Sequence, residues 1–246
     1  MRIVNRVRSY LERFIDSLTM MMFLALFMVA LYALLDIHLV NVSAEMDTQI
    51  AELAPDKTGE DIDLTELRKI NPDIIAWLRI DGTKINYPIV QAKDNNKYLV
   101  HDYKGNYSTA GSIFLDYRDT PFKNDYSIIY GHRMEGERMF GPILRFEEKE
   151  YFDNHRTGKL YTADGVFNLE ISDFAVINVD TTSIYSHKLN KNGHNSEIIA
   201  EVRSNAKQSR ELEFAENDQI LILSTCNTDS KHYRDILLIK MIPEKK

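Results

Sequence analysis

Residues 219–242 read QILILSTCNTDSKHYRDILLIKMI, and this stretch decides how the chain folds. The apolar runs 219–226 and 234–242 have the length of β-strands, and the polar segment NTDSKHY lies between them. Two strands joined by so short a loop most simply form an antiparallel hairpin. The hairpin places Cys226, at the end of its first strand, opposite Arg234, at the start of its second.

Similar short apolar or alternating runs, separated by turn residues, recur upstream of the hairpin. Their spacing is typical of an antiparallel β-barrel or a β-sandwich, so the chain is expected to be mainly β. The runs are AWLRI (76–80), INYPIV (85–90), GSIFLDY (111–117), YSIIYGH (126–132), GKLYTA (158–163) and VFNLEISDFAVINV (166–179).

Two segments of this region carry a helical signal instead. Residues 63–77 favour a helix broken at Pro72. Between the late strands, residues 196–209 place Ile198, Ile199, Val202 and Ala206 on one face at helical spacing. A helix is therefore predicted to be inserted between the late strands.

The N-terminal region contains an apolar segment, Leu18–Leu35, with no charged residue. Its length approaches the roughly 20 residues that cross a bilayer as a helix. The preceding residues include four arginines and the following ones are acidic, which predicts a cytoplasmic N-terminus. We therefore expect a cytoplasmic N-terminus over 1–17, a single-pass membrane anchor over 18–40, a stalk with short helices over 41–65, and an extracytoplasmic domain over 66–246. A signal peptide cleaved near Val42-Ser43-Ala44 is the alternative.

The composition narrows the possible functions. The net charge is −7, from 30 basic and 37 acidic residues, which argues against a nucleic-acid partner. The single cysteine excludes an internal disulfide. No sequence motif for a metal or organic cofactor is present, so none is expected.

Cys226 is the candidate nucleophile. A guanidinium opposite a thiol favours the reactive thiolate, because a nearby cation lowers the pKa of a thiol. The same guanidinium can donate hydrogen bonds to an oxyanion that forms on a substrate carbonyl. The polar neighbours of Cys226 also indicate a reactive thiol rather than a buried structural one.

A cysteine enzyme that transfers acyl groups also needs a proton carrier. The chain has seven histidines. His132 ends an apolar run and follows Gly131, whereas His232 lies in the same loop as the cysteine. Sequence spacing alone does not decide between His132 and His232.

The segments Leu223-Ser224-Thr225-Cys226 and Tyr130-Gly131-His132, together with Arg234, resemble class B sortases, the cysteine transpeptidases of Gram-positive cell surfaces. The likeness covers about residues 63–242, and Ile222 departs from it. It implies a sortase-type eight-stranded β-barrel over residues 66–246, with N-terminal helices and an inserted helix. It also selects His132, with Cys226 and Arg234, as the catalytic residues. The residues that match the family's substrate groove are Asn95, Leu99, Tyr130, Thr181, Tyr185 and Ser224.

The resemblance also implies a reaction. The enzyme would cleave the sorting signal of a secreted surface protein after Thr through a thioacyl-enzyme. It would then join the product to an amine of the cell-wall precursor or, in the alternative, to a pilin lysine. A cysteine peptidase that uses water and a non-catalytic binding domain tethered to the cell membrane remain the rival hypotheses.

Overall fold

The computed structural model describes residues 2–43, 54–55, 62–186, 195–226 and 231–244. The chain divides into two compact units, Met1–Val42 and Ser43–Lys246, and each is considered by itself. Much of the expected stalk, residues 41–65, lies outside the described residues, as does Ala44 of the possible cleavage site.

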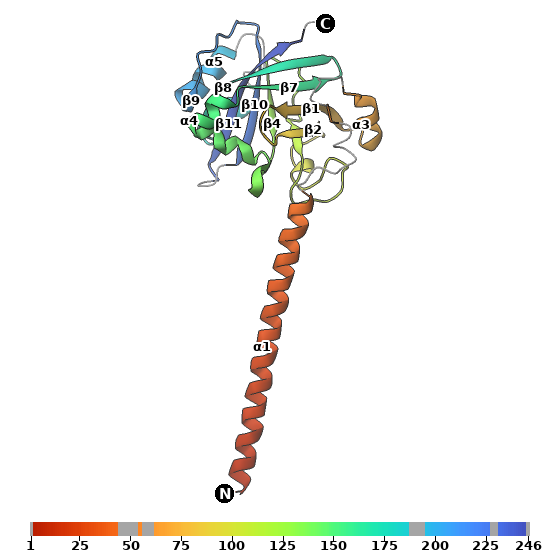
Figure 1. The fold of residues 1–246 in the computed structure, drawn as a ribbon, viewed down its shortest axis with the longest axis vertical. Coiled ribbons are helices and arrows are strands. Elements are labelled where there is room, and N and C mark those ends of the chain that lie inside the picture. The colour runs from red at the N-terminus through yellow and green to blue at the C-terminus, as the bar shows by residue number, and fades with distance from the viewer. Residues whose placement is uncertain (1, 44–53, 56–61, 187–194, 227–230, 245–246) are drawn as a thin grey trace. The chain divides into compact units, whose positions relative to one another are not determined.

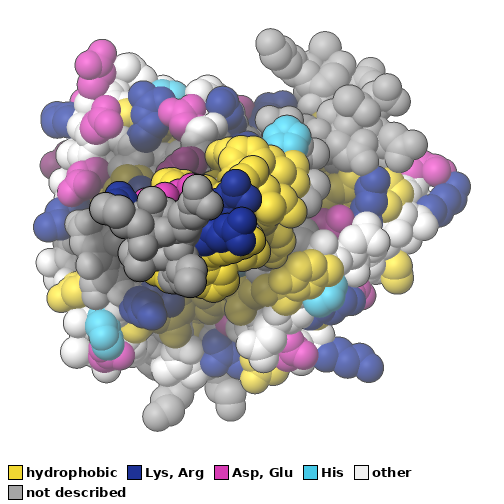
Figure 2. Space-filling model, turned by 90° about the horizontal axis from the view of Figure 1, so that it is seen from below, with side chains coloured by type: hydrophobic (Ala, Val, Ile, Leu, Met, Phe, Trp, Pro, Cys, Tyr) yellow, Lys and Arg dark blue, Asp and Glu magenta, His cyan; other side chains and the backbone are white. Residues whose placement is uncertain are grey.

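The first unit is the helix α1 (Arg2–Ser43), which runs for 42 residues. Within Arg8–His38, an 18-residue window has a mean hydropathy of 2.4, and none of that window is buried inside the protein. Viewed from the N-terminal end, apolar side chains surround the helix, with Lys and Arg side chains at the near end (Figure 2). A helix that is apolar on all sides and long enough to cross a bilayer is a candidate membrane span. The expected N-terminal apolar helix is therefore confirmed.

The second unit is built on a closed β-barrel (Figure 1). Eight strands of the described residues hydrogen-bond in the order β11-β10-β4-β3-β2-β1-β7-β8, and β8 pairs with β11 to close the ring. The barrel, and not the sandwich, is therefore the fold. The barrel strands are β1 (Ile74–Ile80), β2 (Asn86–Val90), β3 (Ile113–Leu115), β4 (Tyr126–Tyr130), β7 (Thr157–Thr162), β8 (Gly165–Asn178), β10 (Gln219–Cys226) and β11 (Tyr233–Pro243).

The hairpin strands are apolar throughout because both of their faces are buried. Leu221 and Leu223 of β10 face the barrel interior. Ile220 and Ile222 point outward and pack beneath the helix α5 (Asn195–Ser204), which supplies Ile198, Ile199 and Val202. A strand that is covered on two sides reads as a continuous apolar run rather than an alternating one.

A third apolar cluster lies around Trp77, where the helix α3 (Leu64–Ile70) packs on the barrel. The helix begins at Asp63, whose carboxylate accepts hydrogen bonds from the N–H groups of Thr65 (2.8 Å) and Glu66 (3.4 Å). In the view of Figure 1, α3 and α5 lie on opposite sides of the barrel.

Two of the helix predictions were partly wrong. The helix expected over 63–77 ends at Ile70, and β1 begins at Ile74, because Pro72 restricts the preceding residue to an extended conformation. The helix expected over 196–209 ends at Ser204, and residues Ala206–Ser209 form β9, which pairs with β8. The helix inserted between the late strands is otherwise confirmed.

The remaining elements are short and connect the barrel strands. They are η1 (Lys97–Leu99), β5 (Arg133–Met134), η2 (Glu135–Glu137), β6 (Arg138–Met139), η3 (Gly141–Glu147), α4 (Lys149–Asn154) and η4 (Ile184–Ser186).

Candidate functional site

Three neighbouring strands bring the predicted catalytic positions to one edge of the barrel. β10 pairs with β11 antiparallel, and Cys226 is the register partner of Arg234, as the hairpin predicted. β4 runs parallel to β10, with Tyr130 opposite Ser224. Residues 132 and 226 therefore both lie two positions beyond this pair, at the same edge of the barrel.

The backbone continues this alignment past the end of β4. The N–H of Gly131 donates to the carbonyl of Ser224 at 3.2 Å. A Cβ at position 131 would lie 2.4 Å from Ile113 Cδ1 and 2.7 Å from Phe140 Cδ2, so only glycine fits there. Because residue 131 has no side chain, its backbone can pack directly against Ile113 and Phe140 immediately before His132.

The imidazole of His132 is held by a backbone carbonyl. Its Nε2 lies 2.8 Å from the carbonyl oxygen of Leu99. A carbonyl oxygen only accepts hydrogen bonds, so Nε2 must carry the proton. In the neutral ring, Nδ1 then holds the lone pair that can take up a proton. The contact fixes both the orientation of the ring and its tautomer.

The guanidinium of Arg234 is half-buried at the start of β11. Its Nη1 donates to the carbonyls of Lys231 (3.0 Å) and Tyr233 (2.9 Å). The backbone of Cys226 is described, whereas its side chain is not. The common location of residues 132, 226 and 234 is therefore argued from the register of β4, β10 and β11, and not from contacts of the Cys226 side chain.

His232, the rival proton carrier, is bound to another part of the surface. Its Nδ1 lies 2.6 Å from Oδ2 of Asp180, and both side chains are more than half exposed. The His232 carbonyl accepts from the N–H of Val179 at 2.8 Å. His232 therefore joins the start of β11 to the turn that follows β8.

Several predicted groove residues lie in contact on the outer face of β4 and β10. The hydroxyl of Tyr185 is 2.9 Å from Ser224 Oγ. The rings of Tyr130 and Tyr185 stack with centroids 6.3 Å apart and an interplanar angle of 29°. Ser183, two residues before Tyr185, donates to the carboxylate of Glu201 in α5 at 2.5 Å. The inserted helix thus fixes the segment that carries Tyr185.

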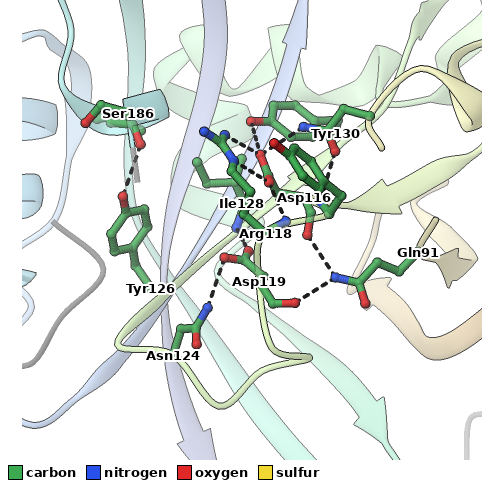
Figure 3. Close-up of polar contacts among 12 residues, drawn as sticks. Gln91, Asp116, Arg118, Asp119, Asn124, Tyr126, Ile128, Tyr130 and Ser186 are labelled. Atoms are coloured by element: carbon green, nitrogen blue, oxygen red, sulfur yellow. Dashed lines mark hydrogen bonds and ion pairs between the residues drawn. The ribbon is translucent and has the colours of Figure 1, made fainter. Parts of the chain in front are cut away.

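A buried carboxylate, Asp116, connects Tyr130 of this aromatic pair to Asn95. Figure 3 shows Asp116 with Tyr130 and Arg118. Asp116 has no exposed surface. Its Oδ2 accepts from the Tyr130 hydroxyl and from Asn95 Nδ2, each at 3.0 Å. Arg118 binds both oxygens of the carboxylate, through Nε at 2.9 Å and Nη2 at 2.7 Å.

These contacts join four of the six predicted groove residues: Asn95, Tyr130, Tyr185 and Ser224. Leu99 touches the site through its carbonyl on His132, and its side chain is exposed. Thr181 is exposed, and its N–H donates to the carbonyl of Asn178 at 3.4 Å. Within the part of the chain that the structure describes, no hydrogen bond joins Thr181 to the other predicted groove residues.

Sequence reasoning missed Asp116 and Arg118 as parts of this network. A usable signal was present in GSIFLDYRD, where an acid and a base two residues apart directly follow a short apolar strand. Charges placed at the end of a buried strand need partners, which makes them candidates for a structural ion pair.

Comparisons with known proteins agree with this architecture. The family model described as the sortase domain matches residues 78–241. A sortase B of Listeria monocytogenes is 33% identical over 180 residues, which are 72% of this chain and 72% of the relative. The X-ray structure of Clostridium perfringens sortase B has a TM-score of 0.67 and 30% identity, over 73% of this chain and 100% of that chain. A complex of Staphylococcus aureus sortase B with substrate has a TM-score of 0.67 and 25% identity, over 74% of this chain and 85% of that chain.

Proposed function

We propose that this chain, which belongs to class B of the sortase family of cysteine transpeptidases, attaches secreted surface proteins to the cell wall. It would cleave a C-terminal sorting signal after a threonine and join the threonine carbonyl to an amine of the cell-wall precursor. The observation that supports this most is the register of β4, β10 and β11. It brings positions 132, 226 and 234 to one edge of the barrel.

The proposed reaction has two halves. The Cys226 thiolate attacks the threonine carbonyl, and the guanidinium of Arg234 stabilises the oxyanion. The C–N bond breaks, the imidazolium of His132 gives a proton to the departing amine, and a thioacyl-enzyme remains. An incoming amine then attacks the thioester, neutral His132 takes its proton, and the thiolate is released.

The contact between His132 and Leu99 assigns the two ring nitrogens different tasks in this scheme. Nε2 keeps its proton on the Leu99 carbonyl throughout, so the proton that moves is carried by Nδ1. The ring need not rotate between the two halves of the reaction.

The sorting peptide would bind along the outer face formed by the predicted groove residues. Tyr130, Tyr185 and Ser224 would form one wall, and Asn95 and Leu99 the other. Thr181 would border the groove beyond Tyr185. A Staphylococcus aureus relative of the same fold has been solved with its substrate, which supports a peptide site on this barrel.

The direct test mixes the full chain, in detergent micelles, with pentapeptides varied at each sorting position and with an excess of a small amine. Mass spectrometry of the products separates the hypotheses. A peptide–amine adduct supports transfer, the free acid alone supports a water-using peptidase, and no cleavage of any peptide contradicts the proposal. Adding a peptide lysine in place of the small amine asks whether a pilin-type acceptor is preferred.

Arg234→Ala is expected to lower kcat about 10²–10³-fold, because a donor to the oxyanion is lost. Arg234→Lys should recover only part of this loss, since an ammonium cannot reproduce the planar fork of a guanidinium. The measurement is the rate of peptide cleavage at saturating substrate. Wild-type kcat in the alanine variant would remove Arg234 from the mechanism.

The anchor is proposed to be residues 18–40, with 1–17 in the cytoplasm, 41–65 as the stalk and 66–246 outside. Arginines on the N-terminal side of α1 support this orientation. In intact cells, protease added outside should therefore digest residues 66–246 and spare a tag placed at the N-terminus. A protected C-terminal domain would contradict the orientation, and release of the domain into the medium would indicate a cleaved signal peptide.

A further inference from the structure

Asp116 is a fully buried carboxylate that receives four side-chain hydrogen bonds from three residues. It directly follows β3, and its carboxylate is drawn with Arg118 and Tyr130 in Figure 3. Oδ1 accepts from Arg118 Nε at 2.9 Å, and Oδ2 accepts from Arg118 Nη2 at 2.7 Å. Oδ2 also accepts from Tyr130 and Asn95, each at 3.0 Å.

An ion pair whose carboxylate is fully buried is not an efficient source of stability, although Arg118 remains one-third exposed. Desolvation of the carboxylate offsets much of the attraction, and a well-packed apolar pair is often as stable. The arrangement does, however, fix the geometry of every donor that points at the carboxylate. Burial, followed by the charge of Asp116, raises the pKa of Tyr130, so the phenol keeps the proton that it donates.

The turn that carries Asp116 is itself held on several sides. Gln91 Nε2 donates to the carbonyls of Asp116 and Asp119, both at 2.8 Å. Asp119 accepts from the N–H of Ile128 in β4 at 3.1 Å. The carboxylate of Asp116 is therefore held in place between β3 and β4, and it in turn holds in place the groups that hydrogen-bond to it.

The two neutral donors on Asp116 belong to the two segments that flank His132. Tyr130 ends β4 two residues before His132, and its ring stacks on Tyr185. Asn95 lies four residues before Leu99, whose carbonyl binds the imidazole. Asp116 thus sets the spacing between the 95–99 segment and the 130–132 segment.

The amide of Asn95 uses only part of its hydrogen-bonding capacity within the protein. Its oxygen accepts from the N–H of Tyr117 at 2.9 Å, and one of its two N–H bonds is directed at Asp116. One N–H donor remains for a ligand. Asn95 is thereby suited to a carbonyl oxygen of a bound peptide.

We propose that Asp116 is a positioning residue for substrate binding, which holds Tyr130 and Asn95 at the separation that admits the sorting peptide. This inference rests on the proposed function. It assigns Asp116 no contact with substrate and no part in the chemistry at Cys226.

The test is Asp116→Asn in the full chain, assayed with a cleaved sorting peptide. The variant keeps the size of the side chain but cannot accept from Arg118, Tyr130 and Asn95 together, so the groove should loosen. KM is expected to rise about tenfold, while kcat and the rate at which a thiol reagent alkylates Cys226 stay within about threefold of wild type. The matched control is Asp218→Asn, which breaks the Asp218–Lys240 ion pair (2.6 Å) and should leave KM unchanged.

A second variant, Tyr130→Phe, keeps the ion pair and removes only the hydroxyl that Asp116 holds. If Asp116 acts through this hydroxyl, Tyr130→Phe should raise KM several-fold and add little in the Asp116→Asn background. Independent, multiplying effects in the double variant would overturn the inference, as would a KM for Asp116→Asn no higher than that of Asp218→Asn. If Asp116→Asn fails to fold, an unchanged KM in Tyr130→Phe would overturn it.

The outcomes separate this inference from the function on which it rests. If the wild-type chain cleaves no peptide, the proposed function fails, and the positioning role fails with it. If the wild-type chain cleaves and transfers normally while the Asp116 variants keep their KM, only the inference about Asp116 fails.

Discussion

Cys226→Ala is expected to abolish both peptide cleavage and transfer, with kcat falling by at least about 10⁴-fold. The thioacyl-enzyme cannot form without the sulfur, and water has no activated route to the threonine carbonyl in its place. Mass spectrometry should show the acylated enzyme for wild type during turnover and none for the variant. The thermal unfolding midpoint should change little, because residue 226 is the last of β10 and its backbone pairing does not depend on the side chain.

Two controls make the Cys226 result decisive. Cys226→Ala should still bind the sorting peptide, which shows that the groove is intact. Thiol-reagent labelling of wild type should be fast and should slow in His132→Ala. Residual cleavage above about 1% of the wild-type rate in Cys226→Ala, which is a loss of less than about 10²-fold, would place the nucleophile elsewhere. A slow labelling rate that does not change in His132→Ala would favour the hypothesis of a non-catalytic binding domain tethered to the membrane.

The fold could be predicted largely because strand signals in this chain are local. The hairpin at 219–242 is short, and its register could be read from the loop length, including Cys226 opposite Arg234. The closure of the ring by β8 and β11 could not be read in this way. Pairing between strands that are distant in sequence depends on packing in the interior, which periodicity does not encode; the resemblance supplied that answer.

The two misread segments show how packing overrides local pattern. Ala206 falls on the apolar face of the predicted helix, yet it pairs with Ala175 of β8 in β9. Ile74 and Trp77 are spaced as on a helix, but both are buried in a strand. A strand covered on both faces has apolar residues at almost every position, so helical spacing arises in it by chance.

The sequence predicts the reactive residue types of the candidate site and not the contacts that support them. Cys226 and Arg234 end or begin apolar runs, whereas the family resemblance, and not the spacing, selects His132 over His232. The supporting contacts are different in kind. The Leu99 carbonyl on His132 is a backbone atom, available at any residue. Asp116 is one of many acids, and it differs from them in the donors that meet on its buried carboxylate, which are Arg118, Tyr130 and Asn95.

His132→Ala is expected to lower kcat about 10²–10⁴-fold, whereas His232→Ala should stay within about threefold of wild type. His132 follows the strand that aligns with β10, and its Nε2 is fixed on Leu99. His232 is bound to Asp180 on an exposed surface, at the turn that follows β8. The comparison uses single-turnover cleavage across pH, so that a loss of proton transfer is separated from a loss of binding.

The ratio of the two losses distinguishes the histidines. If His132 supplies the proton to the departing amine, His132→Ala should slow the cleavage step itself, and His232→Ala should not. A comparable loss in both variants, or a larger loss in His232→Ala, would reverse the assignment of the acid. The alignment of β4 with β10 would then bring His132 to the edge of the barrel that carries Cys226 without making it the proton donor.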